Sequence, residues 1–181
     1  VLIKLIDAKE PLSIQVHPSD EYALKAEHEY GKTEMWYIVD CDPGASLYFG
    51  VNRTVTPEEF RRRIEDNTVE EVLNRVPVRP GDVFFIEAGT LHAIGGGILI
   101  CEIQQNSNCT YRVYDYGRRG ADGQLRELHI DKALDVSRLT PSEDRCKALE
   151  TQTISGGSMT RLAECRYFTA DRFNVESEVN I

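Results

Sequence analysis

The sequence predicts a mainly β protein, a sandwich or barrel of jelly-roll type with one short helical insertion and the start of a second β domain. Short apolar or alternating segments follow one another along most of the chain, and turn residues such as Asp42-Pro43-Gly44 and Gly95-Gly96-Gly97 separate them. Many short strands with turns between them are typical of antiparallel sandwiches and barrels. Helix-start signals are concentrated between residues 56 and 74, and a new set of strand-like segments begins near residue 150.

Strands are predicted where apolar residues are continuous or alternate with polar ones, because side chains two apart on a strand share a face. In the segment 32–39 this alternation places Lys32, Glu34 and Trp36 on one face and Met35 on the other. The predicted strands cover residues 1–6, 12–17, 32–39, 45–51, 83–87, 98–104 and 110–115, and further strands begin within 159–175.

Helices are predicted from capping residues and from apolar spacing. Ser19 is the expected N-cap of a short helix that continues to about Glu29. Thr56, followed by a proline and two acids, predicts a helix to about residue 65. Thr68 and Glu71 have the spacing of a capping box and predict a helix to about residue 74. Residues 128–137 carry apolar side chains at helical spacing and predict one more helix.

Three regions are expected along the chain. They are a barrel over residues 1–120, a helical connector over 121–148 and the truncated start of a second β domain over 149–181. The chain opens without Met inside a strand-like run, and it stops at Ile181 without a helix or cap. We therefore expect a fragment of a longer protein that lacks strands at both ends.

Composition limits the function classes. With 181 residues, 41% hydrophobic and 28% charged, the chain is predicted to be a soluble globular protein. Thirty acids against 21 bases give a net charge of −9, which argues against nucleic-acid and membrane partners and requires any phosphate pocket to be locally basic. Five cysteines without paired spacing fit reduced thiols in the cytoplasm, and we find no membrane span or signal peptide.

A mixed set of nitrogen and oxygen ligands predicts a metal site. Gln15 and His17 lie two apart in one predicted strand and therefore point the same way. Glu34 lies in a second strand-like run, and His92 lies just past a third. Two imidazoles, a carboxylate and an amide oxygen suit zinc or another borderline divalent ion. Such a site, with a position left open for substrate, is more often catalytic than structural.

Several ordered motifs resemble a known family. Segment 81–92 is close to the second sequence motif of cupins, and segments 14–18 and 31–37 are similar to the first half of type I phosphomannose isomerases. Segments 110–118 and 127–130 resemble the shorter bacterial form of that enzyme. The resemblance covers about Val1 to Leu139, with one departure at Glu87, where cupins usually have proline.

The resemblance implies a cupin fold and a zinc-dependent mannose-6-phosphate isomerase with one divalent ion per chain. By that similarity Gln15, His17, Glu34 and His92 would hold the metal, and Arg112 would be the catalytic arginine. The expected reaction moves a proton between C1 and C2 of a sugar phosphate through an enediolate, whose negative charge a divalent cation and a fixed guanidinium would stabilise.

The proton-transferring base is not identified by the sequence. A metal-bound water, a neighbouring carboxylate and Lys32 are the candidates, and we expect Lys32 to contact substrate because it shares the face of Glu34. Arg118 and Arg119 could reach a phosphate but fit a surface loop better. His28 is expected to be solvated, and His129 to pack against or cap a helix.

Two other functions are compatible with the same ligands. A non-haem iron cupin oxygenase also uses two histidines and a carboxylate, although the cations Lys32 and Arg112 have no purpose there. A non-catalytic sugar-phosphate-binding cupin would keep the metal without turnover. Elemental analysis separates zinc from iron, and an assay with mannose 6-phosphate separates an enzyme from a binder.

Overall fold

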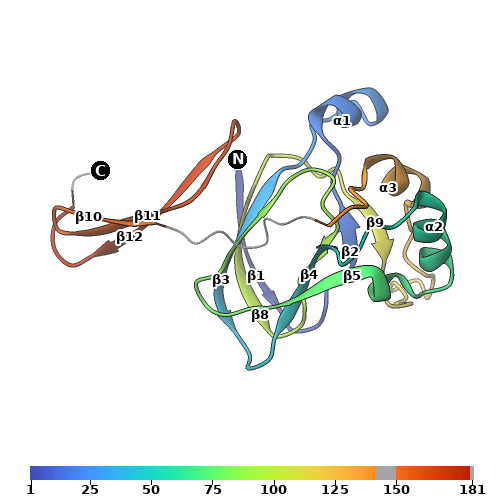
Figure 1. Cartoon of the computed structure of the whole chain (residues 1–181), viewed down its shortest axis with the longest axis horizontal. Coiled ribbons are helices and arrows are strands. Elements are labelled where there is room, and N and C mark those ends of the chain that lie inside the picture. The colour runs from blue at the N-terminus through green and yellow to red at the C-terminus, as the bar shows by residue number, and fades with distance from the viewer. Residues whose placement is uncertain (142–149, 180–181) are drawn as a thin grey trace.

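The computed structural model describes residues 1–141 and 150–179, and their strands form three antiparallel sheets (Figure 1). The first sheet contains, in spatial order, β1 (Leu2–Ala8), β8 (Ile98–Gln104), β3 (Glu34–Cys41) and β6 (Val83–Ile86). The second contains β5 (Leu73–Pro77), β4 (Ser46–Val51), β7 (His92–Ala93), β2 (Ile14–Val16) and β9 (Tyr111–Tyr114). The third contains β10 (Thr151–Ile154), β11 (Gly157–Glu164) and β12 (Thr169–Val175).

The first two sheets enclose an apolar core between them. Trp36 and Ile38 of β3 contribute to this core from one sheet, and Leu47 and Phe49 of β4 contribute from the other. Ile100 of β8 lies in the same cluster. Packing of two antiparallel sheets face to face over such a core is the architecture that the strand pattern predicts, and the mainly β class is confirmed.

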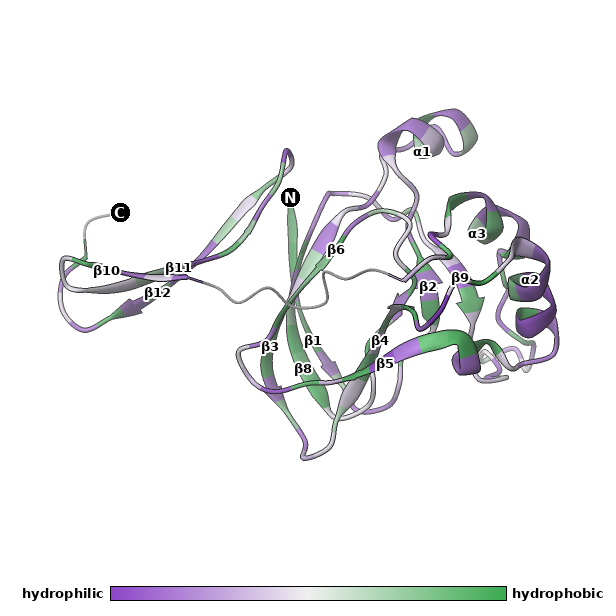
Figure 2. Ribbon diagram, viewed as in Figure 1, coloured by the Kyte–Doolittle hydropathy of each residue, from purple (hydrophilic) through white to green (hydrophobic). Residues whose placement is uncertain are grey.

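Helices cover the outer face of the five-stranded sheet. They are α1 (Asp20–Ala26), α2 (Pro57–Glu65) and α3 (Ile130–Val136), and Figure 1 shows them on the side of the barrel away from β10–β12. Phe60 and Ile64 of α2 are buried in a second apolar core with Val16 and Val113 of the sheet. Figure 2 shows that α2 is otherwise largely hydrophilic, as a helix with one buried face requires.

Capping explains where the first two helices begin. The Ser19 side chain accepts a hydrogen bond from the Tyr22 amide, and the Thr56 side chain accepts one from the Glu59 amide. Both predicted N-caps are confirmed. The first helix is shorter than predicted, because it ends at Ala26 rather than near Glu29. His28 has a φ of 57°, a left-handed conformation that an α-helix cannot contain.

The predicted helix after Thr68 is wrong. The chain forms only a short 3₁₀ helix, η1 (Val69–Val72), and then continues as strand β5. The Thr68 side chain makes no capping hydrogen bond, so the capping-box spacing is present without its function. Val69, Val72 and Leu73 are instead buried in the core beneath the helices, and this tertiary packing decides the local structure.

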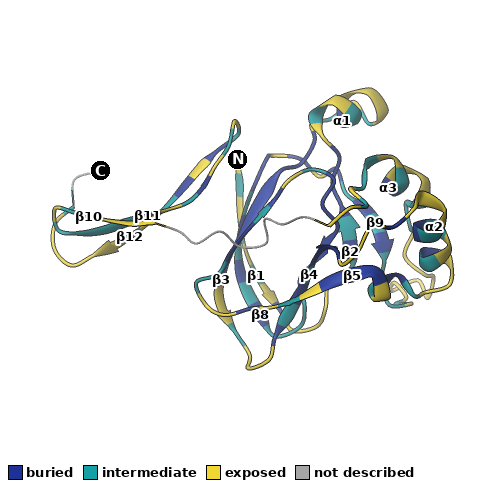
Figure 3. Cartoon of the chain, in the orientation of Figure 1, coloured by how far each residue is buried: buried dark blue, intermediate teal, exposed yellow. Residues whose placement is uncertain are grey.

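The third sheet packs on the outer face of the four-stranded sheet. Ala163, Phe168 and Ala170 of this sheet and its turn bury against Met35 and Val83 of the barrel. Figure 3 shows that most of β10–β12 is exposed or intermediate, whereas the strands of the barrel are largely buried. The expected second β region is therefore present, and it begins at Thr151.

The division at residues 120 and 148 stays a prediction, and the end of the expected connector, residues 142–148, lies outside the described residues. Within the described ranges, none of the helices has the length and apolar character needed to cross a bilayer.

Candidate metal centre

Strands from both sheets of the barrel bring the predicted ligands together. His17 follows β2, His92 opens β7, and Glu34 opens β3 in the opposite sheet. One ligand atom from each of these three residues lies within 4.8 Å of the other two. His17 is 1% exposed, and Glu34 and His92 are 0% exposed. We call these three residues the His–Glu–His cluster.

Backbone carbonyls orient both imidazoles. His17 Nδ1 lies 3.0 Å from the carbonyl oxygen of Cys109, and His92 Nδ1 lies 2.7 Å from that of Thr90. Because a carbonyl oxygen only accepts, Nδ1 of each ring must carry the hydrogen and donate it. Nε2 of each neutral ring is then left with a free lone pair. This is how proteins usually prepare histidine for metal binding.

Glu34 faces both of these Nε2 atoms. Its two carboxylate oxygens lie 3.5 Å from His17 Nε2 and 3.4 Å from His92 Nε2. Within the described part of the chain, Oε1 of Glu34 and Nε2 of His17 are buried without a hydrogen-bond partner, and Oε2 of Glu34 makes only an ion pair with Lys32. Unsatisfied buried polar atoms are costly. A shared divalent cation would satisfy all of them, so the residues present fit a metal ion.

The pKa shifts of the cluster also favour the protonation states that bind a metal ion. Burial by itself would raise the pKa of Glu34, but the positive charges of His17 and His92 in their protonated forms and of Lys32 hold that pKa well below its usual value, and at neutral pH Lys32 keeps the carboxylate ionised. Burial, together with His17, lowers the pKa of His92 to about 3. His92 is therefore neutral at pH 7, the form that binds metals.

The predicted fourth ligand, Gln15, lies beside the cluster. Gln15 is the cross-strand partner of His92, and its Nε2 lies 3.3 Å from Nε2 of that histidine. An amide binds a metal through its oxygen, so ligation requires the Gln15 amide to turn over about its last side-chain bond. The structure thus brings Gln15 to the cluster without presenting its oxygen there.

Lys32 contacts the cluster directly. Its Nζ lies 3.0 Å from Glu34 Oε2, and the residue is only 5% exposed. The strand alternation placed Lys32 on the face of Glu34, and the structure agrees, although Lys32 lies just before β3 rather than within it. A buried cation therefore lies beside the carboxylate.

Arg112 lies one strand away from the cluster. It pairs with Gln15 across β2 and β9, so the two residues share a face of the sheet. Its Nη1 donates to the Glu127 carbonyl at 2.9 Å, and its Nε is buried without a partner among the residues described. Burial and the nearby Arg126 lower the pKa of Arg112. The guanidinium therefore retains a free donor on the side of the sheet that carries Gln15.

Known proteins are similar to this chain in sequence and in structure. No protein-family model matches the chain. Mannose-6-phosphate isomerase ManA of Bacillus subtilis is 46% identical over all of this chain and 57% of its own length. The mannose-6-phosphate isomerase of Streptococcus mutans is 39% identical over all of this chain and 56% of its own length. The crystal structure of the B. subtilis isomerase has a TM-score of 0.89 at 39% identity and covers 96% of this chain and 55% of that one.

The chain is thus similar over its whole length to mannose-6-phosphate isomerases. It spans little more than half the length of the curated relatives it matches. A zinc-bound structure of mannose 6-phosphate isomerase has a TM-score of 0.66, with 14% identity over 90% of this chain and 59% of its own. At that identity the likeness supports the fold alone, which is the cupin fold that the motifs predict.

Beside the cluster, the inner face of the barrel carries an ion pair that the sequence did not predict. Lys4 Nζ lies 2.9 Å from Glu102 Oε1, and Trp36 Nε1 donates to Glu102 Oε2 at 3.0 Å. Trp36, Glu102 and Lys4 are cross-strand partners, so they share the inner face on which Trp36 lies. Strand alternation could have predicted this, because Glu102 is two residues from Ile100 and therefore shares its inward-facing side, and Ile100 lies in the inner core.

The remaining candidates lie elsewhere. Arg118 donates to the carbonyls of Asp115 and Pro11, and Arg119 donates to that of Gly123, so both are bonded within loops. His129 precedes α3 without a side-chain cap, and its Nδ1 accepts the amide hydrogen of Arg112. His28 is exposed, as predicted. Glu87, at the position where cupins have proline, forms an ion pair of 2.9 Å with Arg138.

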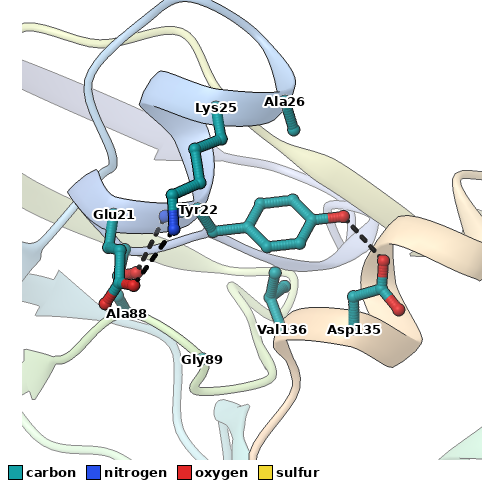
Figure 4. Close-up of a pocket in the computed structure, with 9 residues that line it drawn as sticks. Glu21, Tyr22, Lys25, Ala26, Ala88, Gly89, Asp135 and Val136 are labelled. Carbon is teal, nitrogen blue, oxygen red and sulfur yellow. Dashed lines mark hydrogen bonds and ion pairs between the residues drawn. The ribbon is translucent and has the colours of Figure 1, made fainter.

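A surface groove of about 540 Å³ lies between α1, α3 and the turn at Gly89. Figure 4 shows Tyr22 of α1 reaching across to Asp135 of α3, with which it forms a hydrogen bond of 2.7 Å. Lys25 is paired with Glu21 in the same view. The charged groups of this groove are thus paired with each other or with Tyr22, and no residue of the His–Glu–His cluster lines it.

Proposed function

We propose that the protein is a zinc-dependent isomerase that interconverts mannose 6-phosphate and fructose 6-phosphate. The observation that supports this most is the buried His–Glu–His cluster, whose possible ligand atoms lie within 4.8 Å of one another. The family relationship supplies the reaction, because the relatives that match the whole chain are named mannose-6-phosphate isomerases. Since the chain spans about 57% of such a relative, the proposal concerns the protein in which this segment functions.

Zinc is the proposed ion because the ligand types suit it. His17, Glu34 and His92 offer two nitrogens and a carboxylate, and the amide oxygen of Gln15 could complete a set of borderline hardness. When bound, the ion would act as a Lewis acid that stabilises negative charge on the vicinal oxygens of the sugar. The proposed ion count is one for each chain.

Two cations of the chain would assist the reaction. Lys32 lies against Glu34 in a buried position and would contact the sugar oxygens beside the metal. Arg112 would offer its unpaired Nε–H, and a preorganised donor of this kind is worth roughly 3–4 kcal/mol in the transition state. Both cations also supply the locally basic environment that a phosphate ester needs in a protein with net charge −9.

The structure adds one named group to the candidates for the base. Glu102 is 3% exposed, shares the inner face of the barrel and is held by Lys4 and Trp36. Glu102 is therefore our candidate for the neighbouring carboxylate, beside Lys32 and a metal-bound water. We also propose a cytoplasmic location, which the substrate and the free thiols of the four cysteines in the described ranges support.

Two measurements test the proposal together. Metal content of the purified protein should show zinc near one per chain, and a coupled assay should show turnover of mannose 6-phosphate that a chelator abolishes and zinc restores. Iron with oxygen consumption would favour the oxygenase. Stoichiometric zinc with sugar-phosphate binding but no turnover, in a chain that also carries the rest of the relatives' length, would favour a non-catalytic binder.

A further inference from the structure

A single carboxylate connects the third sheet to the start of β3. Asp20 Oδ1 accepts hydrogen bonds from the Gly31 amide and from Gln105 Nε2, both at 3.0 Å. Asp20 Oδ2 accepts from Tyr167 OH at 2.9 Å and from Arg166 Nη2 at 3.2 Å. A first-turn acid that only favours its helix needs none of these partners. Asp20 therefore links segments that lie outside its own helix.

Gln105 extends this connection by one residue. The side-chain Oε1 of Gln105 accepts a hydrogen bond from the backbone amide of Thr33 at 2.7 Å. The backbone amide of Gln105 donates to the Thr33 carbonyl at 3.0 Å. The Gln105 side chain thus joins Asp20 to Thr33, the residue between Lys32 and Glu34. Gln105 is only 8% exposed, so water competes little with these bonds.

Together these bonds fix the backbone on both sides of Lys32. Asp20 holds the Gly31 amide, Gln105 holds the Thr33 amide, and the Lys32 amide itself donates to the Pro18 carbonyl at 3.1 Å. Gly31 is packed so closely that a Cβ there would lie 2.4 Å from the carbonyl carbon of Ser19. Three successive peptide groups are therefore anchored where Lys32 directs its Nζ at Glu34.

We propose that Asp20 is a positioning residue for Lys32, and that the β11–β12 turn holds Asp20 in place through Arg166 and Tyr167. The inference rests on the proposed function, because that function gives Lys32 its contact with substrate. It assigns a role to the third sheet, which contributes no residue to the His–Glu–His cluster. Small displacements of an aligned group cost large factors in rate, so a connection of this kind affects turnover more than binding.

A double-mutant cycle tests whether Asp20 acts through Lys32. Asp20→Ala should lower kcat about tenfold, with zinc content kept and KM changed less than about twofold. In a Lys32→Ala background the same substitution should lower kcat no further. Equal losses in the two backgrounds would overturn the proposal, because Asp20 would then act independently of Lys32.

A milder variant and a control separate positioning from simple stability. Tyr167→Phe removes one hydrogen bond to Asp20 and should lower kcat by a smaller factor than Asp20→Ala does. Arg172→Gln removes another bond between the third sheet and the barrel, the one from Arg172 Nη1 to Tyr37 OH at 3.2 Å, without touching Asp20. Its kcat should equal that of the wild type. A loss as large as that of Tyr167→Phe would contradict the proposal.

Amide hydrogen exchange gives a readout that needs no activity. Exchange at Gly31, Lys32 and Thr33 should become faster in Asp20→Ala and Tyr167→Phe and stay at the wild-type rate in Arg172→Gln. Unchanged exchange in Asp20→Ala would overturn the proposed connection. An inactive wild type that also carries the rest of the relatives' length, with the expected exchange pattern, would refute the proposed function and leave the positioning contact supported.

Discussion

The four histidines of the chain differ in what their ring nitrogens meet. In His17 and His92, Nδ1 faces a backbone carbonyl, so Nε2 keeps its lone pair. In His129, Nδ1 accepts a hydrogen bond from the Arg112 amide, so Nε2 of the neutral ring carries the hydrogen and cannot bind a metal. His28 is exposed. Hydrogen bonding distinguishes His17 and His92 from His129, and burial distinguishes them from His28, so these two rings are the ones suited to bind a metal.

Replacing one ligand should abolish metal binding. His92→Ala removes a lone pair from a three-residue cluster, and loss of one of three protein ligands leaves a site too weak to retain zinc. Elemental analysis after gel filtration should give far less than one zinc for each chain. His28→Ala is the matched control, since it removes an exposed histidine and should keep the metal. Stoichiometric zinc in His92→Ala would exclude this residue as a ligand.

Arg112 should matter for turnover and not for the metal. Arg112→Ala should keep the zinc and lower kcat/KM by about 10²–10³, the usual effect of losing one preorganised donor. Arg119→Ala removes an exposed loop arginine and serves as the control. Steady-state kinetics with mannose 6-phosphate decide the point. A kcat/KM equal to that of the wild type would remove Arg112 from the machinery.

The metal-free protein should lose stability as the pH falls from 7 to 4. His92 has a pKa lowered to about 3 in the folded state, so between this value and about 6.5 the unfolded chain binds a proton that the folded chain does not. Stability therefore rises with pH in this window, by at most about 1.4 kcal/mol per pH unit for one group. The lowered pKa of Glu34 acts in the same direction below about 4.5. Urea unfolding at several pH values measures the slope, and a flat profile would contradict the assignment.

The sequence predicted the cluster better than its surroundings. His17, Glu34 and His92 belong to ordered motifs on predicted strands, and period two alone placed Lys32 beside Glu34. Lys4 and Glu102 were missed, because each is a lone charge in an apolar strand and only the pairing of β1, β8 and β3 shows that they meet. The tie between Asp20 and Tyr167 spans 147 residues, and such a contact leaves no local signal.

At the scale of elements, capping residues predicted a helix correctly where the apolar side chains of that helix also pack into the core. Thr56 and its following proline begin α2 as predicted, and Phe60 and Ile64 of that helix meet the sheet. The capping-box spacing at Thr68 had the same local strength but failed. Leu73 and Asn74 pair or bond with β4 instead, and a strand there completes the edge of the five-stranded sheet. Strand pairing and core packing therefore override the local tendency of the Thr68 segment to form a helix.

The buried face of α2 should contribute to stability and not to the metal site. Phe60 is 0% exposed within the core under the helices, so Phe60→Ala should lower the free energy of unfolding by about 3–5 kcal/mol. Zinc affinity should stay at the wild-type value, because the cluster lies on the opposite face of the sheet. Urea unfolding and a zinc competition assay measure the two effects. Arg62→Ala, on the exposed face of α2, should change neither, and a weakened zinc affinity in Phe60→Ala would contradict this separation.

At the scale of the molecule, four layers follow one another. Helices cover the five-stranded sheet, the four-stranded sheet lies behind it, and the third sheet contacts the outside of that one near its β11–β12 turn and otherwise extends away from the barrel (Figure 1). The His–Glu–His cluster lies between the two large sheets, where candidate ligands from both sheets meet. The outer layers supply stability on one side and, through Asp20, the proposed positioning of Lys32 on the other.

Anomalous diffraction from a zinc-soaked crystal tests the central claim most directly. We expect one strong peak at the zinc edge, about 2.0–2.2 Å from Nε2 of His17, Nε2 of His92 and a carboxylate oxygen of Glu34. The Gln15 oxygen should face the same peak. A crystal of protein that binds zinc in solution but shows its peak elsewhere, or none between the two sheets, would contradict the account.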